Sequence, residues 1–192
     1  MTTKQKVDPY LSLLEIPPGY LNITGLINGS SNSELGLRAV VWLQGCMRGC
    51  SDCFNPYSQS FESNRLISID NLAKIITSNP QNQGVTFSGG EPFWQAPALT
   101  ELAKQVKAAG LNVMAFSCFS LERLQSPYAP ARSQELLAQL DVLVDSSGIK
   151  SVKADKEESG TSPDRRVHIF NPALKESMAY YLEIVYSISD LA

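Results

Sequence analysis

Short apolar runs are the clearest pattern along the chain. They are rich in Val, Leu, Ile and Phe, and most of them are bounded by Gly, Pro, Ser or Asp. Runs of this length and composition predict buried β-strands. The five predicted strands occupy residues 37–44, 84–87, 111–116, 141–145 and 166–170.

The segments between these runs carry apolar residues at helical spacing. Ser68 is a potential N-cap, and the helix after it is expected to bury one face. The residues on that face are Ile69, Leu72, Ala73, Ile75 and Ile76. A second helix is expected between Pro97, which suits a first turn, and Gly110, which suits a position just past the end. Shorter helical pieces are expected at 120–125 and 133–140. Strands that alternate with helices predict an α/β fold with a mainly parallel sheet.

Composition indicates a soluble globular protein. The 192 residues are 43% hydrophobic and 18% charged, which suits a single domain over residues 21–192 with an N-terminal extension over 1–20. The net charge of −3 gives no reason to expect a nucleic-acid or membrane surface. The N-terminus lacks the apolar segment of a secretory signal, and no stretch approaches the length of a membrane span. A cytoplasmic location is therefore expected.

Three cysteines, Cys46, Cys50 and Cys53, follow the first predicted strand in a C-x3-C-x2-C spacing. Three thiolates on one loop suit a [4Fe–4S] cluster in which one iron keeps an open position. A structural zinc site normally takes four protein ligands. The alternative is a zinc knuckle that Cys118 or His168 would complete.

A second motif, Ser88-Gly89-Gly90-Glu91-Pro92, follows the second predicted strand. Two residues without side-chain bulk allow a ligand to approach the backbone closely. The carboxylate of Glu91 could then hold an ammonium group beside the cluster. The alternative is a simple strand-to-helix turn.

These motifs share one position in the predicted fold. The cysteine loop, Gly89-Gly90-Glu91, Ser117-Cys118 and Asp145 each lie just beyond the carboxyl end of a strand. Parallel sheets bind ligands at that edge. A single active site on one rim is therefore expected.

The quoted residues resemble a known family. Residues 35–46, the cysteine triplet with Phe54-Asn55-Pro56, and residues 85–93 are similar to the radical S-adenosylmethionine (radical SAM) activating enzymes. The small activating proteins of anaerobic ribonucleotide reductases are the best match. The resemblance covers roughly residues 25–145 and implies a partial (β/α) barrel of the radical SAM type.

The resemblance also implies cofactors and roles. Cys46, Cys50 and Cys53 would bind the [4Fe–4S] cluster, and S-adenosylmethionine would chelate its fourth iron. The implied cofactor-binding residues are Asp52, Cys53, Phe54, Gly89, Gly90, Glu91, Ser117 and Asp145. No catalytic side chain is expected, because the cofactors carry the chemistry. One electron from the reduced cluster would cleave S-adenosylmethionine to a 5′-deoxyadenosyl radical, which would take a hydrogen atom from a glycine of a partner.

The implied partners are a glycyl-radical enzyme, with anaerobic ribonucleotide reductase placed first, and a flavodoxin or ferredoxin as reductant. Two other functions stay open. One is a radical SAM enzyme that modifies a small molecule or peptide, because residues 146–165 differ from the pattern of the activating enzymes. The other is a non-catalytic iron–sulfur or zinc protein.

Overall fold

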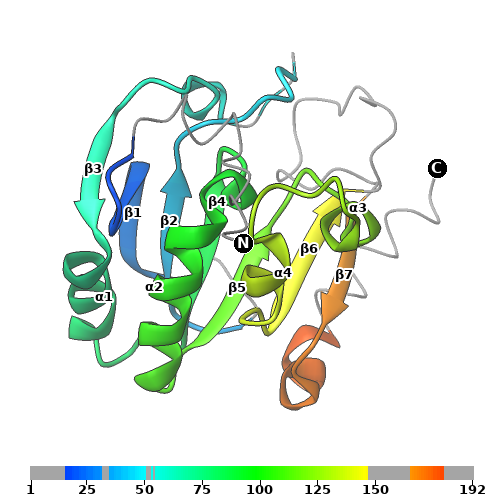
Figure 1. Cartoon of the computed structure of the whole chain (residues 1–192). Coiled ribbons are helices and arrows are strands. Elements are labelled where there is room, and N and C mark those ends of the chain that lie inside the picture. Colours follow the sequence, from blue (N-terminus) through cyan, green and yellow to red (C-terminus); the bar gives the residue numbers. More distant parts are fainter. Residues whose placement is uncertain (1–15, 32–34, 51–52, 54, 147–164, 180–192) are drawn as a thin grey trace, which may run out of the picture.

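The computed structural model of the chain describes residues 16–31, 35–50, 53, 55–146 and 165–179. Its described part is built on an open seven-stranded sheet of order β3-β1-β2-β4-β5-β6-β7 (Figure 1). The strands are β1 (Tyr20–Ser30), β2 (Arg38–Leu43), β3 (Arg65–Ser68), β4 (Gly84–Gly89), β5 (Asn112–Phe116), β6 (Val142–Ser146) and β7 (Arg165–Ile169). The central strands β2, β4, β5 and β6 are parallel. Antiparallel strands extend the sheet at both sides. The predicted fold class is confirmed.

The helices also follow the prediction. They are α1 (Ile69–Ser78), α2 (Ala96–Ala108), α3 (Leu121–Gln125) and α4 (Ser133–Leu137), with 3₁₀ turns η2 (Pro56–Ser58), η3 (Pro92–Gln95) and η4 (Pro172–Leu174). The Ser68 hydroxyl accepts a hydrogen bond from the N–H of Asn71, which confirms it as the N-cap of α1. Ile75 is an exception to the predicted apolar face, because it is 39% exposed.

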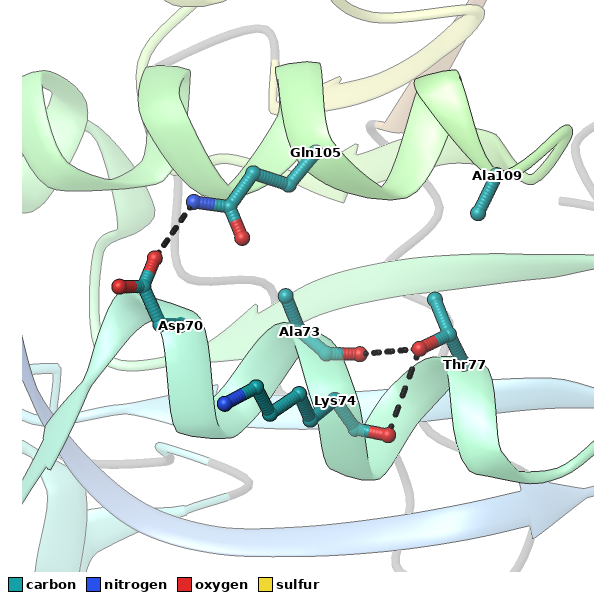
Figure 2. Close-up of a pocket in the computed structure, with 6 residues that line it drawn as sticks. All are labelled: Asp70, Ala73, Lys74, Thr77, Gln105 and Ala109. Carbon is teal, nitrogen blue, oxygen red and sulfur yellow. Dashed lines mark hydrogen bonds between the residues drawn. The ribbon is translucent and has the colours of Figure 1, made fainter.

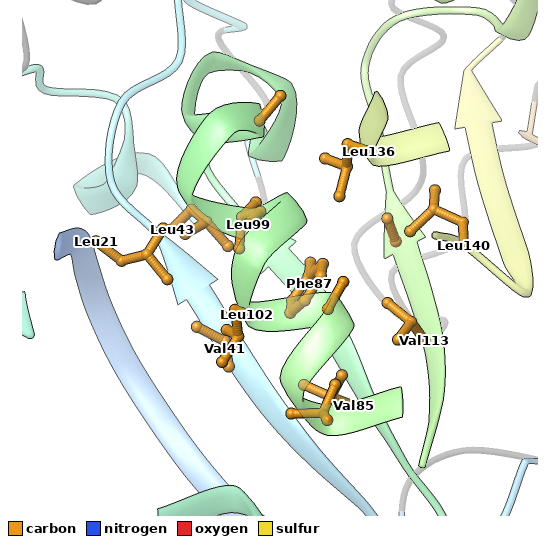
Figure 3. Close-up of a cluster of buried hydrophobic side chains, with 14 of the residues drawn as sticks. Leu21, Val41, Leu43, Val85, Phe87, Leu99, Leu102, Val113, Leu136 and Leu140 are labelled. Atoms are coloured by element: carbon orange, nitrogen blue, oxygen red, sulfur yellow. The ribbon is translucent and has the colours of Figure 1, made fainter. Parts of the chain in front are cut away.

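The main hydrophobic core lies between the sheet and the helices. Helices α1, α2 and α4 lie on the same face of the sheet (Figure 1). Leu99 and Leu102 of α2 pack over the central strands, where Val41, Val85 and Phe87 are fully buried (Figure 3). Each buried side chain of this size stabilises the fold by about 1.5–3 kcal/mol relative to an exposed one.

A second, smaller cluster lies on the opposite face of the sheet. Side chains alternate between the two faces of a strand, so Met114 points away from its neighbours Val113 and Ala115, which belong to the main core. Met114 packs instead with Val142 and Val144. The sheet therefore carries apolar packing on both faces, as expected for parallel strands.

Two strands were not predicted. β1 spans eleven residues, but Asn22, Gly25 and Gly29 interrupt its apolar pattern. Register shifts occur between Ile23 and Gly25 and again between Asn28 and Ser30. Strand β3 has only four residues, and two of them are exposed. The five predicted strands are confirmed, with ends that move by no more than two residues.

Some predictions concern residues outside the described ranges. Residues 1–15 belong to the predicted N-terminal extension, and most of the polar segment 146–164 is likewise not described. The proposed domain boundaries therefore stay predictions. In the part of the chain that the structure describes, no helix has both the length and the apolar character needed to span a membrane.

Candidate functional site

The carboxyl ends of the parallel strands bring three sequence motifs to one edge of the sheet. Leu43 at the end of β2 pairs with Gly89 at the end of β4. Phe87 of β4 pairs with Ala115 of β5, and Phe116 pairs with Val144 of β6. The cysteine loop, Gly90-Glu91 and Ser117-Cys118 begin directly after these ends. This edge is called the rim below.

Backbone hydrogen bonds close the cysteine loop at its base. The N–H of Gly45 donates to the carbonyl of Ser58 at 2.7 Å, and the N–H of Cys46 donates to the carbonyl of Gln59 at 3.1 Å. The side chain of Gln59 donates in turn to the carbonyl of Cys50. The loop therefore begins and ends beside the end of β2, and the three cysteines belong to the segment between these two points.

All four cysteines are free thiols, and Cys46 differs from the others in its surroundings. The neighbouring Cys118 side chain lowers the pKa of Cys46 to about 6. Burial opposes this shift, and Arg48 adds to it. The Cys46 side chain and burial in turn raise the pKa of Cys118. Cys46 is thus prepared to act as a thiolate, the form that binds metals.

The chemistry of the loop fits an iron–sulfur cluster, although the loop does not hold its ligands together. Cys46, Cys50 and Cys53 supply three free thiols, one of them with a lowered pKa. Yet among the described residues no three Cys, His, Asp or Glu side chains form a group that could hold a metal ion. The assignment of the three cysteines as ligands stays a prediction.

The two glycines of the second motif make room for the protein's own backbone. A Cβ atom on Gly90 would lie 2.5 Å from the carbonyl oxygen of Gly45. Gly89 has φ = +93°, and a Cβ atom there would lie 2.6 Å from the backbone nitrogen of Leu43. Gly89 therefore lets β4 pack closely against the end of β2, and Gly90 lets the following segment pack against the base of the cysteine loop. Their predicted contact with S-adenosylmethionine stays a prediction.

Glu91 connects all three parts of the rim. Its N–H donates to the carbonyl of Gly45 at 2.9 Å, beside the first cysteine. Its carboxylate accepts from the hydroxyl of Ser117 at 3.0 Å, from the N–H of Cys118 at 2.6 Å and from the N–H of Phe93 at 3.1 Å. Burial raises the pKa of Glu91 to about 7, although these three hydrogen bonds act in the opposite direction.

The carboxylate of Glu91 keeps one acceptor position. An ionised carboxylate has about four lone-pair sites, two on each oxygen. Oε1 accepts from Ser117 and Phe93, whereas Oε2 accepts from Cys118 alone among the hydrogen bonds described. A buried oxygen with a free lone pair is a suitable partner for a cationic ligand.

Asp145 lies at the end of β6 but contacts protein groups. It is fully buried and accepts from the N–H of Leu121, the first residue of α3, at 2.6 Å. The guanidinium of Arg166 donates to both of its oxygens at 3.0 and 2.7 Å. Asp145 thus joins α3 to β7. Its predicted contact with S-adenosylmethionine has no support in these contacts and stays a prediction.

His168 lies on β7, next to Asp145 and away from the cysteine loop. Its Nε2 is 3.0 Å from Asp145 Oδ2, but the angle is not that of a hydrogen bond. The zinc alternative would need this histidine, or Cys118, to join the three cysteines, and no such group occurs among the described residues. Asp52 and Phe54, which were predicted to line the cofactor, lie outside the described residues.

Gln95 supports the rim and was not predicted. It is buried at the end of η3, and its amide donates to the carbonyls of Asn22 and Gln44 at 2.8 and 2.9 Å. Its oxygen accepts from the N–H of Asn22 at 2.9 Å. Gln95 therefore links β1 to the start of the cysteine loop. The only sequence signal is a polar residue next to the apolar Phe93-Trp94 pair.

An open hollow of about 400 Å³ lies between α1 and α2. Figure 2 shows Gln105 of α2 donating to Asp70 of α1 across it, with Lys74 nearby. The hollow shares no residue with the rim, so it is separate from the predicted site.

Comparison with known proteins agrees with the resemblance of the motifs. The chain is 37% identical over 83 residues to a pyruvate formate-lyase-activating enzyme of Staphylococcus epidermidis, which covers 40% of this chain and 33% of the relative. The corresponding enzyme of Staphylococcus aureus (strain USA300) is 35% identical over 83 residues, with the same coverage. The chain thus spans about a third of the length of these curated relatives.

The predicted resemblance to radical SAM activating enzymes is confirmed by these relatives. The match to an iron–sulfur family and the similarity to activating enzymes imply the expected cofactors, a [4Fe–4S] cluster and S-adenosylmethionine. Residues 33–168, which contain the whole rim, match the family described as 4Fe-4S single cluster domain. The chain belongs to this 4Fe-4S single cluster domain family.

Proposed function

We propose that the chain is a radical SAM activating enzyme, which binds a [4Fe–4S] cluster at Cys46, Cys50 and Cys53 and generates a glycyl radical on a partner enzyme. The observation that carries the proposal is the position of Glu91. This one buried residue is bonded to Gly45, beside the first cysteine, and to Ser117 and Cys118 at the end of β5. A ligand held by Glu91 would lie between these elements.

The protein's own residues would bind and orient S-adenosylmethionine. The free lone pair on Glu91 Oε2 is the proposed partner of the methionyl ammonium. Gly90 allows the base of the cysteine loop to lie close to Glu91, so that an amine bound at Glu91 would also lie near the thiolates. When bound, the reduced cluster supplies the single electron that cleaves S-adenosylmethionine.

The partner is proposed as a glycyl-radical enzyme. The names of the relatives point to pyruvate formate-lyase, which those proteins activate. The motif resemblance points first to anaerobic ribonucleotide reductase, and a flavodoxin or ferredoxin is the proposed electron donor. A cytoplasmic location agrees with both partners.

The first part of the test concerns the cluster. Anaerobic reconstitution should give about four irons per chain. Cys50→Ala should remove the broad visible absorbance of the cluster. Cys118→Ala is the matched control and should keep it, because Cys118 is not a proposed ligand. Equal losses in the two variants would show that Cys118 is a ligand.

The second part concerns the reaction. Dithionite-reduced protein mixed with S-adenosylmethionine should release 5′-deoxyadenosine. Addition of pyruvate formate-lyase or anaerobic ribonucleotide reductase in separate samples should give a glycine-centred signal in electron paramagnetic resonance in one of them. Release of 5′-deoxyadenosine without a radical on either protein would favour a small-molecule or peptide substrate. No release at all would favour a non-catalytic cluster protein.

A further inference from the structure

We propose that Arg48 is a positioning residue for cofactor binding. Its hydrogen bond to Cys118 holds the cysteine loop in a fixed place relative to Glu91, so that a ligand bound by Glu91 is presented to the cluster. The hydrogen bond itself belongs to the described contacts of the rim. Its consequence for the ligand rests on the proposed function, in which the loop binds the cluster and Glu91 binds S-adenosylmethionine.

Arg48 connects the middle of the cysteine loop to the end of β5. It lies halfway between Cys46 and Cys50, and its guanidinium donates to the carbonyl of Cys118 at 2.7 Å. Arg48 and Cys118 are 70 positions apart in the sequence. The N–H of Cys46 and the carbonyl of Cys50 are instead bound to Gln59, which follows the loop closely in the sequence. Arg48 therefore adds a contact with the sheet to the contacts that close the loop locally.

Cys118 is held at both of its backbone polar groups. Its carbonyl accepts from Arg48, and its N–H donates to the carboxylate of Glu91 at 2.6 Å. The N–H of Glu91 donates in turn to the carbonyl of Gly45, directly before the first cysteine. These contacts form a closed ring, because Gly45 and Arg48 are linked through the chain. Loss of Arg48 would open this ring, and the loop beyond Gly45 could then move relative to Glu91.

The local sequence explains why the loop needs such an anchor. Gly49 follows Arg48 with φ = +53°, and a Cβ atom there would meet no other atom within 4 Å. Glycine loses more conformational freedom on ordering than any other residue. Arg48, Gly49 and Cys50 are all exposed, so burial does little to fix them. A single hydrogen bond at Arg48 should therefore have a measurable effect on the order of the loop.

Hydrogen exchange in the protein without cluster or ligand tests the anchor. Arg48→Met removes the charge and the donors but keeps an unbranched side chain. The amides of Cys46 and Cys118 are hydrogen-bonded in the structure. In the variant they should exchange about three- to tenfold faster, as expected for the loss of one hydrogen bond of ordinary strength. Exchange in β4 should stay the same. Unchanged exchange at both cysteines, or an equal increase in β4, would overturn the proposal.

Binding of S-adenosylmethionine tests the consequence. In the anaerobically reconstituted protein, Arg48→Met should weaken the affinity for S-adenosylmethionine by about three- to tenfold. The iron content should stay the same, because the three proposed ligands are intact. A parallel loss of iron would overturn the positioning role, since Arg48 would then be needed for the cluster itself. Weaker binding without faster exchange in the ligand-free protein would overturn it as well, because Arg48 would then act on the ligand directly.

Two further variants complete the test. Arg48→Lys keeps a charged donor and should restore most of the lost affinity and the slow exchange of Cys118; a variant that behaves like Arg48→Met would contradict the proposal. Arg123→Met is the matched control, because Arg123 is also exposed but its guanidinium lies over the ring of Tyr128, 5.6 Å from its centre. It should change neither quantity. An equal effect of Arg123→Met would show that the loss of positive charge, and not of the anchor, causes the change.

The proposed function can fail separately from this inference. If the natural protein takes up no iron or does not bind S-adenosylmethionine, the proposed function is wrong, and the exchange of Cys118 still decides whether Arg48 anchors the loop. If the natural protein and Arg48→Met bind both equally well, the proposed function stands and the positioning role is wrong.

Discussion

Glu91 is the residue whose protonation should be visible in the stability of the fold. Its pKa of about 7 means that the folded protein binds this proton more tightly than the unfolded chain, in which the value is 4.5. The stabilising contribution is complete below the unfolded pKa and is lost as the pH rises through the folded pKa. A pKa shift of this size changes the free energy of unfolding by an amount on the order of 3 kcal/mol between low and high pH.

We therefore expect the free energy of unfolding of the cluster-free protein to contain a component that falls between about pH 4.5 and 7. Glu91→Gln should remove this component, because the amide does not titrate. Urea unfolding at a series of pH values measures it. Glu101→Gln, which changes an exposed carboxylate on α2, is the control and should leave the slope as it is. A slope that persists in Glu91→Gln would show that another group causes it.

Substitution of Asp145 can distinguish its predicted contact with S-adenosylmethionine from its observed contacts with the protein. Asp145→Asn removes the charge that pairs with Arg166 and turns one acceptor oxygen into a donor. Hydrogen bonds to charged groups contribute about 1.5–3 kcal/mol each, so we expect unfolding to become easier by about 2–3 kcal/mol. Iron content and the affinity for S-adenosylmethionine should not change. Lower affinity at unchanged stability would instead support the predicted cofactor contact.

Some residues of the rim could be predicted and others could not. Cys46, Glu91 and Ser117 follow from local signals, because short motifs that come after apolar runs mark the ends of parallel strands. The roles of Gln95 and Asp145 depend on partners far away in the chain. In the sequence, a single polar residue of this kind belongs to no motif that would distinguish it from an ordinary turn residue.

Among the elements, η3 contributes more to the rim than its four residues suggest. Gln95→Leu would leave the buried N–H of Asn22 and the carbonyl of Gln44 without the partners that Gln95 supplies, whereas the carbonyl of Asn22 keeps the N–H of Gln44. Each unpaired buried group costs about 1–3 kcal/mol, so we expect a loss of about 3 kcal/mol or more in chemical unfolding.

Gln105→Leu is the matched control for this change. Gln105 also donates a hydrogen bond, but it does so at the exposed hollow between α1 and α2 (Figure 2). Its replacement should alter the free energy of unfolding by no more than about 0.5 kcal/mol. Equal effects of the two substitutions would mean that the buried bridge at Gln95 does not stabilise the fold.

The elements that could be predicted are those with one uninterrupted apolar signal. Helix α1 buries Leu72 and Ile76 at helical spacing, and β6 carries a run of three apolar residues. Strand β1 could not be predicted, because two register shifts interrupt its pairing with β2 and its glycines remove the side chains that would show a period of two. Ile75 was assigned to the buried face because helical spacing alone does not define how wide that face is.

At the scale of the whole molecule, the sheet should differ in stability from its centre to its edges. β2, β4 and β5 have a strand on each side and bury their side chains in the main core. β3 and β7 lie at the edges and pair on one side only. We expect amide hydrogen exchange to be slowest in the central strands and clearly faster in β3 and β7. Equal protection in β4 and β7 would argue against this arrangement.

The order of the strands bears on how the protein is made in the cell. Apart from β3, which pairs with β1, the strands after β2 are added in order of synthesis: β4 beside β2, then β5, β6 and β7. A chain that emerges from the ribosome N-terminus first can therefore extend its sheet one strand at a time. The cysteine loop emerges early, but its neighbour Cys118 comes only with the end of β5. Delivery of iron to a nascent chain would meet the loop before its surroundings exist, so cluster loading is expected to follow translation.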